Sequence, residues 1–143
     1  MKPALIAGAL IAGAMSFACD LFATDSIVIA RKKFAKIQYG VASYYHDKFQ
    51  NRLTASGEKF DQKKMTAAHN GLPLNTWIRV TNLRNKRSVI VRVNDRLHRK
   101  NKRLVDLSNI AAKTLGYLDD GLTQVKVEVF GKKKPPELLA GYL

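Results

Sequence analysis

Two neighbouring segments that alternate with the two-residue period of half-buried strands constrain the fold of this chain most. They are residues 77–83 and 88–94, and the short polar insert 84–87 separates them. On the second segment, one face carries Val89, Val91 and Val93, and the other carries Ile90, Arg92 and Asn94. Two alternating runs joined by a turn-length insert predict an antiparallel β-hairpin.

Further short elements flank this hairpin. Residues 39–45, 104–106 and 123–130 are rich in β-branched and aromatic side chains, which favours strands. Residues 65–69 are compatible with a turn of helix or with the end of a strand. A short helix is predicted after Ser108, which can cap it by accepting from a free backbone N–H, and Gly116 suits its end. Residues 46–61 are polar and predict a surface loop.

The spacing of these elements indicates a mainly β fold with one or two short helices. Several short strands separated by polar loops favour a small closed barrel over a parallel α/β sheet. Closure also removes exposed sheet edges. The sequence contains no internal repeat, and its length suits one domain with a modest core.

The two ends of the chain differ in composition from the domain. Residues 1–23 have a positive start at Lys2, an apolar run and the small residues Ser16 and Ala18, which predicts a signal peptide; a membrane anchor and a buried helix are the alternatives. Cys19, the one cysteine, excludes an intrachain disulfide. It is either the lipidated first residue of a lipoprotein or, if the leader is cleaved at Ala18 or Ala23, an unmodified or discarded residue. We expect a basic linker at 24–38, the domain at 39–130 and a basic tail at 131–143.

Charge narrows the partners without choosing one. Twenty-five basic residues stand against 11 acidic ones, which gives a net charge of +14. This charge attracts polyanions of several kinds. The predicted leader favours an anionic cell envelope, and the sequence does not interleave basic residues with an aromatic platform of the kind that single-strand nucleic-acid binders use. We therefore expect no nucleic-acid partner. We also expect the protein to be a monomer.

Several kinds of chemistry are disfavoured by the motifs. The three histidines, at positions 46, 69 and 98, do not have the spacing of a zinc ligand set, and we expect no metal and no cofactor. The sequence contains neither a phosphate-binding glycine loop nor a Gly-x-Ser-x-Gly elbow. Acidic residues in the predicted loops remain, together with His69: Glu58, Asp61, Asp95 and Asp106.

Asp95 has two interpretations. A carboxyl at the end of a rigid strand is well held for general acid catalysis on a glycosidic oxygen. Between Arg92 and Arg96, it is equally suited to an ion pair or a turn. The neighbouring arginines would oppose the protonated form that an acid requires.

Seven short motifs, in order and in register, resemble the RlpA-like (rare lipoprotein A) family. They are Gly40-Val41-Ala42-Ser43-Tyr44-Tyr45, Thr54-Ala55-Ser56-Gly57-Glu58, Thr66-Ala67-Ala68-His69, Leu72-Pro73-Leu74, Val80-Thr81-Asn82-Leu83, Val91-Arg92-Val93-Asn94-Asp95-Arg96 and Val105-Asp106-Leu107-Ser108. The resemblance covers about residues 39–130. It implies a six-stranded double-psi β-barrel like that of expansins and barwin, in an exported bacterial envelope protein that acts on peptidoglycan.

The activity that this resemblance implies is that of a lytic transglycosylase. Such an enzyme cleaves between N-acetylmuramic acid and N-acetylglucosamine without water, leaves 1,6-anhydro ends, and prefers glycan strands poor in stem peptides. The partner would be peptidoglycan glycan strands, and the location the periplasm, with a membrane lipid anchor if Cys19 is acylated.

Residue by residue, the resemblance places the catalytic acid/base on Asp95 and a groove histidine on His69, which would orient Asp95 or the substrate. Glu58 matches a third polar residue that would bind or polarise the sugar. The alternatives are a structural hydrogen bond for His69 and a salt bridge for Glu58. The substrate-binding candidates are Tyr44, with Tyr45 beside it as a sugar platform or as core, and Thr54, Asn94, Arg96 and Asp106, the last with an alternative structural role.

The sequence departs from the family pattern at three places, and the first of them, the loop after Arg96, favours an alternative function. Leu97 and His98 follow Arg96 where the family usually has Gly-Pro, and His46 follows the two tyrosines where Trp-Tyr-Gly is usual. The sequence shows no SPOR domain after the predicted barrel. The alternative is a non-catalytic, expansin-like protein that binds or loosens the wall.

Overall fold

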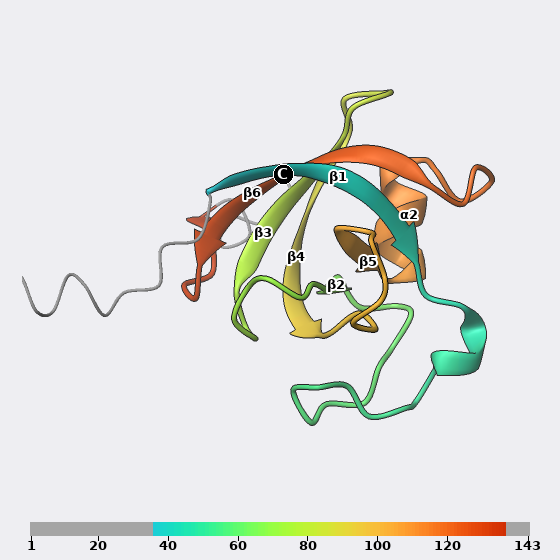
Figure 1. Ribbon diagram of the computed structural model, residues 1–143, viewed down its shortest axis with the longest axis vertical. Helices are drawn as coiled ribbons and strands as arrows, with labels where there is room; N and C mark the ends of the chain where they lie inside the picture. The colour runs from blue at the N-terminus through green and yellow to red at the C-terminus, as the bar shows by residue number, and fades with distance from the viewer. Residues whose placement is uncertain (1–35, 137–143) are drawn as a thin grey trace, which may run out of the picture. The chain divides into compact units, whose positions relative to one another are not determined.

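Six strands close into a barrel in the computed structural model, which describes residues 36–136 (Figure 1). Around the barrel the strands follow the order β1-β5-β2-β4-β3-β6. The elements in chain order are β1 (Ile37–Tyr44), η1 (Asp47–Phe49), β2 (Thr66–Ala68), β3 (Trp77–Asn82), β4 (Ser88–Asp95), β5 (Val105–Leu107), α2 (Asn109–Leu115) and β6 (Thr123–Gly131). The predictions of a mainly β fold and a small closed barrel are confirmed.

The predicted hairpin is formed by β3 and β4, which pair antiparallel from Trp77 opposite Arg92 to Thr81 opposite Ser88. The second face of β4 is more buried than its alternation indicates, because Ile90 and Asn94 are 8% and 2% exposed. At Asn94, the cause is a loop that folds over the end of the strand, since the Ser56 N–H donates to the Asn94 carbonyl at 3.0 Å.

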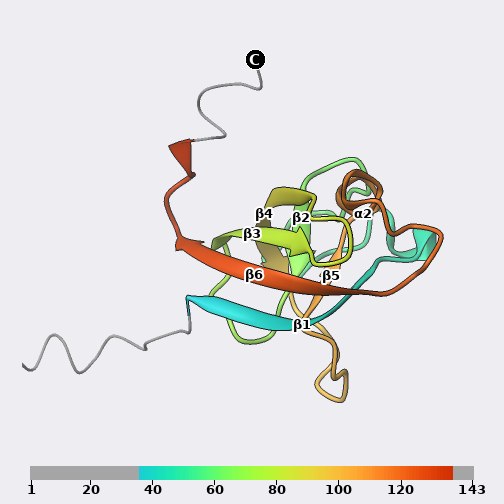
Figure 2. The same cartoon turned by 90° about the horizontal axis from the view of Figure 1, so that it is seen from above.

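Residues 65–69, for which two structures were predicted, contain the strand β2. The strands β2 and β5 are three residues long and their residues are at most 9% exposed, so neither shows a regular alternation of exposed and buried residues. Each takes part in a parallel pair, β2 with β4 and β5 with β1. In the view of Figure 2, β1 and β6 run side by side as an antiparallel pair. The core is made of valines, leucines and alanines from all six strands and α2, with Tyr117 beside them.

The helix α2 begins after Ser108 and ends at Gly116, whose φ of 79° places it in the left-handed conformation predicted for that position. The predicted cap by the Ser108 side chain is wrong, because Ser108 is fully buried and its hydroxyl has no hydrogen-bond partner within the described part of the chain. Gln62 caps the helix instead. Its side-chain oxygen accepts from the Asn109 N–H at 2.8 Å and its carbonyl from the Ile110 N–H at 3.1 Å.

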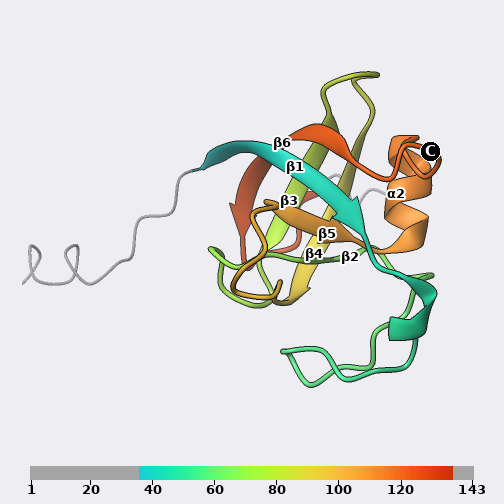
Figure 3. The same cartoon turned by 45° about the vertical axis from the view of Figure 1, so that its right-hand side comes forward.

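The predicted loop at 46–61 is confirmed apart from the single turn η1 and one bridge between Leu53 and Lys59. In Figures 1 and 3 this segment extends from the end of the barrel at which β4 finishes. The predicted signal peptide, Cys19 and most of the linker and tail lie outside the described residues. No helix within residues 36–136 is long and apolar enough to cross a membrane.

Candidate active site

A groove of about 660 Å³ lies where β1 and β4 end. Its walls come from the segment after β1, from η1 and from the loop that follows β4. Two carboxylates, of Asp95 and Asp106, lie among aromatic rings and cations. Of the sequence-predicted site residues, Asp95, Tyr44, Arg96 and Asp106 line the groove, whereas Thr54, Glu58, His69 and Asn94 do not.

Asp95, the last residue of β4, is held by three hydrogen-bond donors. Its Oδ1 accepts from the backbone N–H groups of Ala55 at 2.9 Å and Arg96 at 2.8 Å. Its Oδ2 accepts from the Tyr45 hydroxyl at 2.7 Å. None of these donors is a charged side chain, so within the described residues Asp95 does not form the ion pair that was predicted as one alternative. The carboxyl is fixed in orientation at the edge of the groove.

Tyr45 is the partner that the sequence did not indicate for Asp95. Its ring packs against Phe60, with centroids 4.2 Å apart, and edge-on against Phe49 at 5.7 Å. Burial and the hydrogen bond to Asp95 raise the pKa of Tyr45, so the phenol keeps its proton and donates it to the hydrogen bond. The sequence suggested a sugar platform or core packing for Tyr45, and no local signal links it to Asp95, which is 50 residues away.

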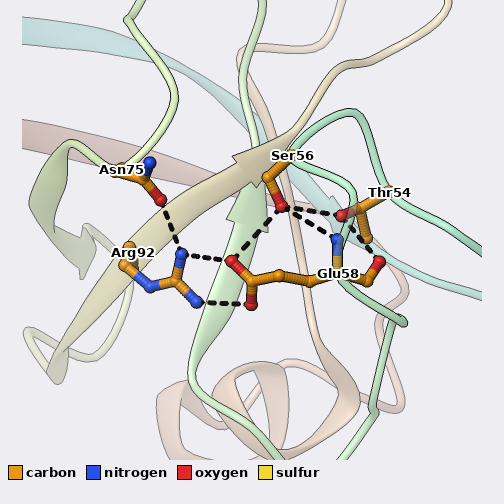
Figure 4. A network of polar contacts seen from close by, with 5 residues as sticks. All are labelled: Thr54, Ser56, Glu58, Asn75 and Arg92. Atoms are coloured by element: carbon orange, nitrogen blue, oxygen red, sulfur yellow. Dashed lines mark hydrogen bonds and ion pairs between the residues drawn. The ribbon is translucent and has the colours of Figure 1, made fainter.

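Glu58 belongs to a polar network that fastens the turn at residues 54–58 to β4 (Figure 4). Its two carboxylate oxygens accept from Arg92 at 2.6 and 2.7 Å, and Arg92 also donates to the Asn75 side chain. The Thr54 hydroxyl donates to the Glu58 carbonyl at 2.9 Å. The Arg92 guanidinium lowers the pKa of Glu58, which stays ionised. Since the Ala55 N–H extends from this turn, the network supports a donor to Asp95.

His69 is buried at 3% exposure, and its ring bonds away from the groove. Its Nδ1 accepts from the Gly71 N–H at 2.9 Å, so Nε2 carries the proton and donates to Gln38 at 2.8 Å. Burial, and then the charge of Arg96, lower the pKa of His69 from 6.5 to about 4. Its backbone lies beside Asp95, because its N–H donates to the Asp95 carbonyl and its carbonyl accepts from the Arg96 side chain.

Asp106 faces the groove in a two-point ion pair with Arg103, with both contacts at 2.9 Å. Tyr44 lies beside it in the groove wall, and its hydroxyl donates to the Leu118 carbonyl at 2.8 Å. Both side chains have structural contacts as well as access to the groove.

Cations that sequence reasoning did not select complete the wall. Lys48 and Arg52 line the groove, and the cationic group of each lies 5.3 Å from the centre of the Phe49 ring. Neither forms an ion pair within the described part of the chain, in contrast to Arg103. With Arg96, they give this groove an excess of positive charge. The only sequence signal for these groove cations was the presence of basic residues in the predicted loop, and periodicity does not show which of them face the groove.

The family model described as lytic transglycolase, a double-psi β-barrel domain, matches residues 37–127. The chain belongs to the lytic transglycolase family. The predicted double-psi β-barrel and the resemblance to RlpA-like proteins are thereby confirmed.

Relatives of this family member include two proteins named endolytic peptidoglycan transglycosylase RlpA. The one from Haemophilus influenzae is 53% identical over 92 residues, which are 64% of this chain and 32% of that protein. The one from Pseudomonas aeruginosa strain PAO1 is 55% identical over 89 residues, 62% of this chain and 26% of that protein. The matched region thus spans about a third or less of these relatives.

Solved structures share the fold of this lytic transglycolase family member. A mutant expansin from Clavibacter michiganensis, in complex with cellohexaose, has a TM-score of 0.55 at 19% identity and covers 70% of this chain and 53% of its own. The Streptomyces papain inhibitor has a TM-score of 0.54 at 21% identity, covering 69% of this chain and 98% of its own. At these identities the likeness concerns the fold.

The loop after Arg96, where this family member departs from the usual Gly-Pro, forms part of the groove. Leu97 is 7% exposed, and its N–H donates to the Asn70 side chain at 2.8 Å. His98 is exposed, and its ring accepts from the Lys100 N–H at 3.2 Å. Leu97 and His98 both line the groove, so the substitution changes the wall next to Asp95.

Proposed function

We propose that this protein is a peptidoglycan lytic transglycosylase and that Asp95 is its acid/base. The observation that carries the proposal is a single carboxyl, fixed by three donors, at the edge of a groove in a lytic transglycolase barrel. Relatives about half identical over the barrel are named endolytic peptidoglycan transglycosylases. The cellohexaose complex of an expansin supports the capacity of this fold to bind a sugar chain.

The proposed reaction requires one carboxyl group because no water is added. Protonated Asp95 donates to the oxygen that links N-acetylmuramic acid to N-acetylglucosamine, as the bond from that oxygen to C1 breaks. The 6-hydroxyl of the muramic acid then attacks C1, returns its proton to Asp95 and closes the 1,6-anhydro ring. The paired carboxylates that ordinary glycosidases use are not needed.

Of the remaining candidates, His69 and Glu58 are proposed to act at a distance from the sugar, and three residues of the groove wall to contact it. His69 positions the backbone around Asp95 and Arg96 through its main-chain hydrogen bonds. Glu58 holds the turn that presents the Ala55 N–H. Tyr44, Arg96 and Asp106 form the groove wall that would bind the glycan.

The preference for peptide-poor strands is supported by the charge of the groove. When the stem peptide is removed, each N-acetylmuramic acid exposes a lactyl carboxylate next to the bond to be cleaved. Lys48, Arg52 and Arg96 would attract such carboxylates, and a cationic groove concentrates an anionic polymer. This substrate places the protein in the cell envelope, either free or lipid-anchored through Cys19.

A second candidate function is expansin-like wall binding without cleavage. The observation that favours it is the bulk of Leu97 and His98 in the groove wall where the family usually has Gly-Pro. If these side chains prevent a glycan from reaching Asp95, the cationic groove would still hold the polymer.

Product analysis by mass spectrometry tests the two functions. The protein, Asp95→Asn and Asp120→Asn are incubated with intact and with amidase-stripped sacculi. Asp120 is a matched control, because its carboxylate pairs with Arg84 outside the groove. We expect anhydro-ended products from the wild type and Asp120→Asn, faster on stripped sacculi, and none from Asp95→Asn. Sacculus binding with no products from any of the three would reject cleavage in favour of the expansin-like function.

A further inference from the structure

The two oxygens of the Asp95 carboxylate differ in the number of donors they accept from. A carboxylate oxygen has two lone-pair positions. At Oδ1 both positions are used, by the backbone N–H groups of Ala55 and Arg96. At Oδ2 one is used, by the Tyr45 hydroxyl at 2.7 Å, and no second donor from residues 36–136 reaches it. Oδ2 is therefore the oxygen able to exchange a proton with a substrate.

Tyr45 is held more firmly than a residue that only fills space would need to be. Its N–H donates to the Leu107 carbonyl at 2.9 Å, and its carbonyl accepts from the Gln62 side chain at 2.8 Å. Its ring is fixed between Phe60 and Phe49. Because the backbone and the ring are both fixed, the position of the hydroxyl is set before any substrate arrives.

We propose that Oδ2 of Asp95 is the atom that transfers the proton, and that Tyr45 is a positioning residue for it. The inference rests on the proposed function. In the acid step, the proton leaves Oδ2 for the glycosidic oxygen as the C1–O bond breaks. In the second step, the proton of the 6-hydroxyl returns to Oδ2 as the bond from C1 to that oxygen forms. Tyr45 keeps its own proton throughout.

The hydrogen bond from Tyr45 to Asp95 does not stabilise the starting state and the transition state of the acid step equally. As the proton leaves, negative charge develops on Oδ2, and a hydrogen bond to a charged oxygen is stronger than one to a neutral carboxyl. The bond therefore stabilises the transition state for proton donation more than the protonated starting state, which is the condition for faster catalysis.

Tyr45→Phe tests this role because it removes the hydroxyl and keeps the ring. We expect kcat on stripped glycan to fall about tenfold to a hundredfold, the size of a hydrogen bond to a charged group. KM on the same glycan should change much less than kcat, because Tyr45 acts through Asp95 in the transition state. Tyr117→Phe is the matched control, since its buried hydroxyl donates to the Ser43 carbonyl at 2.8 Å outside the groove. It should lower stability without lowering kcat.

A second readout does not depend on catalysis. The carboxyl carbon of Asp95, assigned by its absence from the NMR spectrum of Asp95→Asn, should change its chemical shift in Tyr45→Phe and not in Tyr117→Phe, because Oδ2 loses the hydrogen bond from the phenol. A folded Tyr45→Phe with unchanged kcat and an unchanged chemical shift of this carbon would overturn the inference while leaving the proposed function in place. A wild type without anhydro products would overturn the proposed function, and the catalytic role of Tyr45 with it, even if the chemical shift moved.

Discussion

Glu58 and Arg92 form a two-point ion pair, with oxygen–nitrogen distances of 2.6 and 2.7 Å, that ties a surface turn to the strand carrying Asp95. The same turn donates the Ala55 N–H to Asp95 and the Ser56 N–H to the Asn94 carbonyl. Three contacts thus hold the turn to the last residues of β4. Glu58, whose match to the family motifs suggested contact with the sugar, in this geometry holds the turn that donates to Asp95.

Glu58→Gln tests that relationship. We expect a loss of about 1 kcal/mol in the free energy of unfolding, the size of a partly exposed ion pair. The rate at which anhydro-ended products form should fall several-fold, because the Ala55 N–H that donates to Asp95 is held less firmly. Glu128→Gln is the control, since Glu128 pairs with Lys126 on β6 at similar exposure and does not line the groove. It should lower stability alone. A Glu58→Gln protein of unchanged stability that was as inactive as Asp95→Asn would instead indicate direct contact with the sugar.

The low pKa of His69 predicts how stability depends on pH. The unfolded chain binds a proton at this residue below about pH 6.5, whereas the folded protein binds it only near pH 4. Stability contributed by neutral His69 is therefore complete above pH 6.5 and falls as the pH drops toward 4, by on the order of 3 kcal/mol. Urea unfolding at several pH values measures this slope.

His69→Asn, which does not titrate, should flatten the slope between pH 4 and 6.5. His98→Asn removes an exposed histidine and should retain the wild-type slope. Equal slopes in the wild type and His69→Asn would contradict the assignment of this pH dependence to His69.

Removing cations from the groove should weaken the binding of stripped glycan more than removing the same number of cations elsewhere. The double variant Lys48→Gln/Arg52→Gln is expected to raise KM several-fold at low salt, with a smaller effect at high salt because screening already reduces the attraction. Lys132→Gln/Lys133→Gln makes the same change in net charge at exposed positions outside the groove. If both double variants lost affinity equally, total charge rather than the groove would attract the glycan.

The cap of α2 gives a prediction opposite to the one that the sequence suggests. Gln62→Ala removes a side chain that caps the helix and also donates to the Tyr45 carbonyl. It should lower the free energy of unfolding, measured by thermal denaturation, by about 1–2 kcal/mol. Ser108→Ala removes a buried hydroxyl that has no partner, so its cost should be smaller. A larger loss in Ser108→Ala than in Gln62→Ala would restore Ser108 as the cap.

Much of the fold could be predicted because its signals are local. The alternation in β3 and β4 and the glycine that ends α2 depend on neighbours a few residues away. The buried strand β2 was ambiguous, since three buried residues have no polar face. The cap by Gln62 could not be predicted, because it comes from a loop distant in sequence.

The sequence by itself determined the elements, the family motifs and the presence of a carboxyl at the end of a strand, because periodicity and motif spacing are properties of adjacent residues. Only the tertiary structure decided which groups surround Asp95. The donors Ala55 and Tyr45 are 40 and 50 residues away from it in sequence. They reach its two oxygens because the barrel closes and brings the ends of β1 and β4 and the 54–58 turn together.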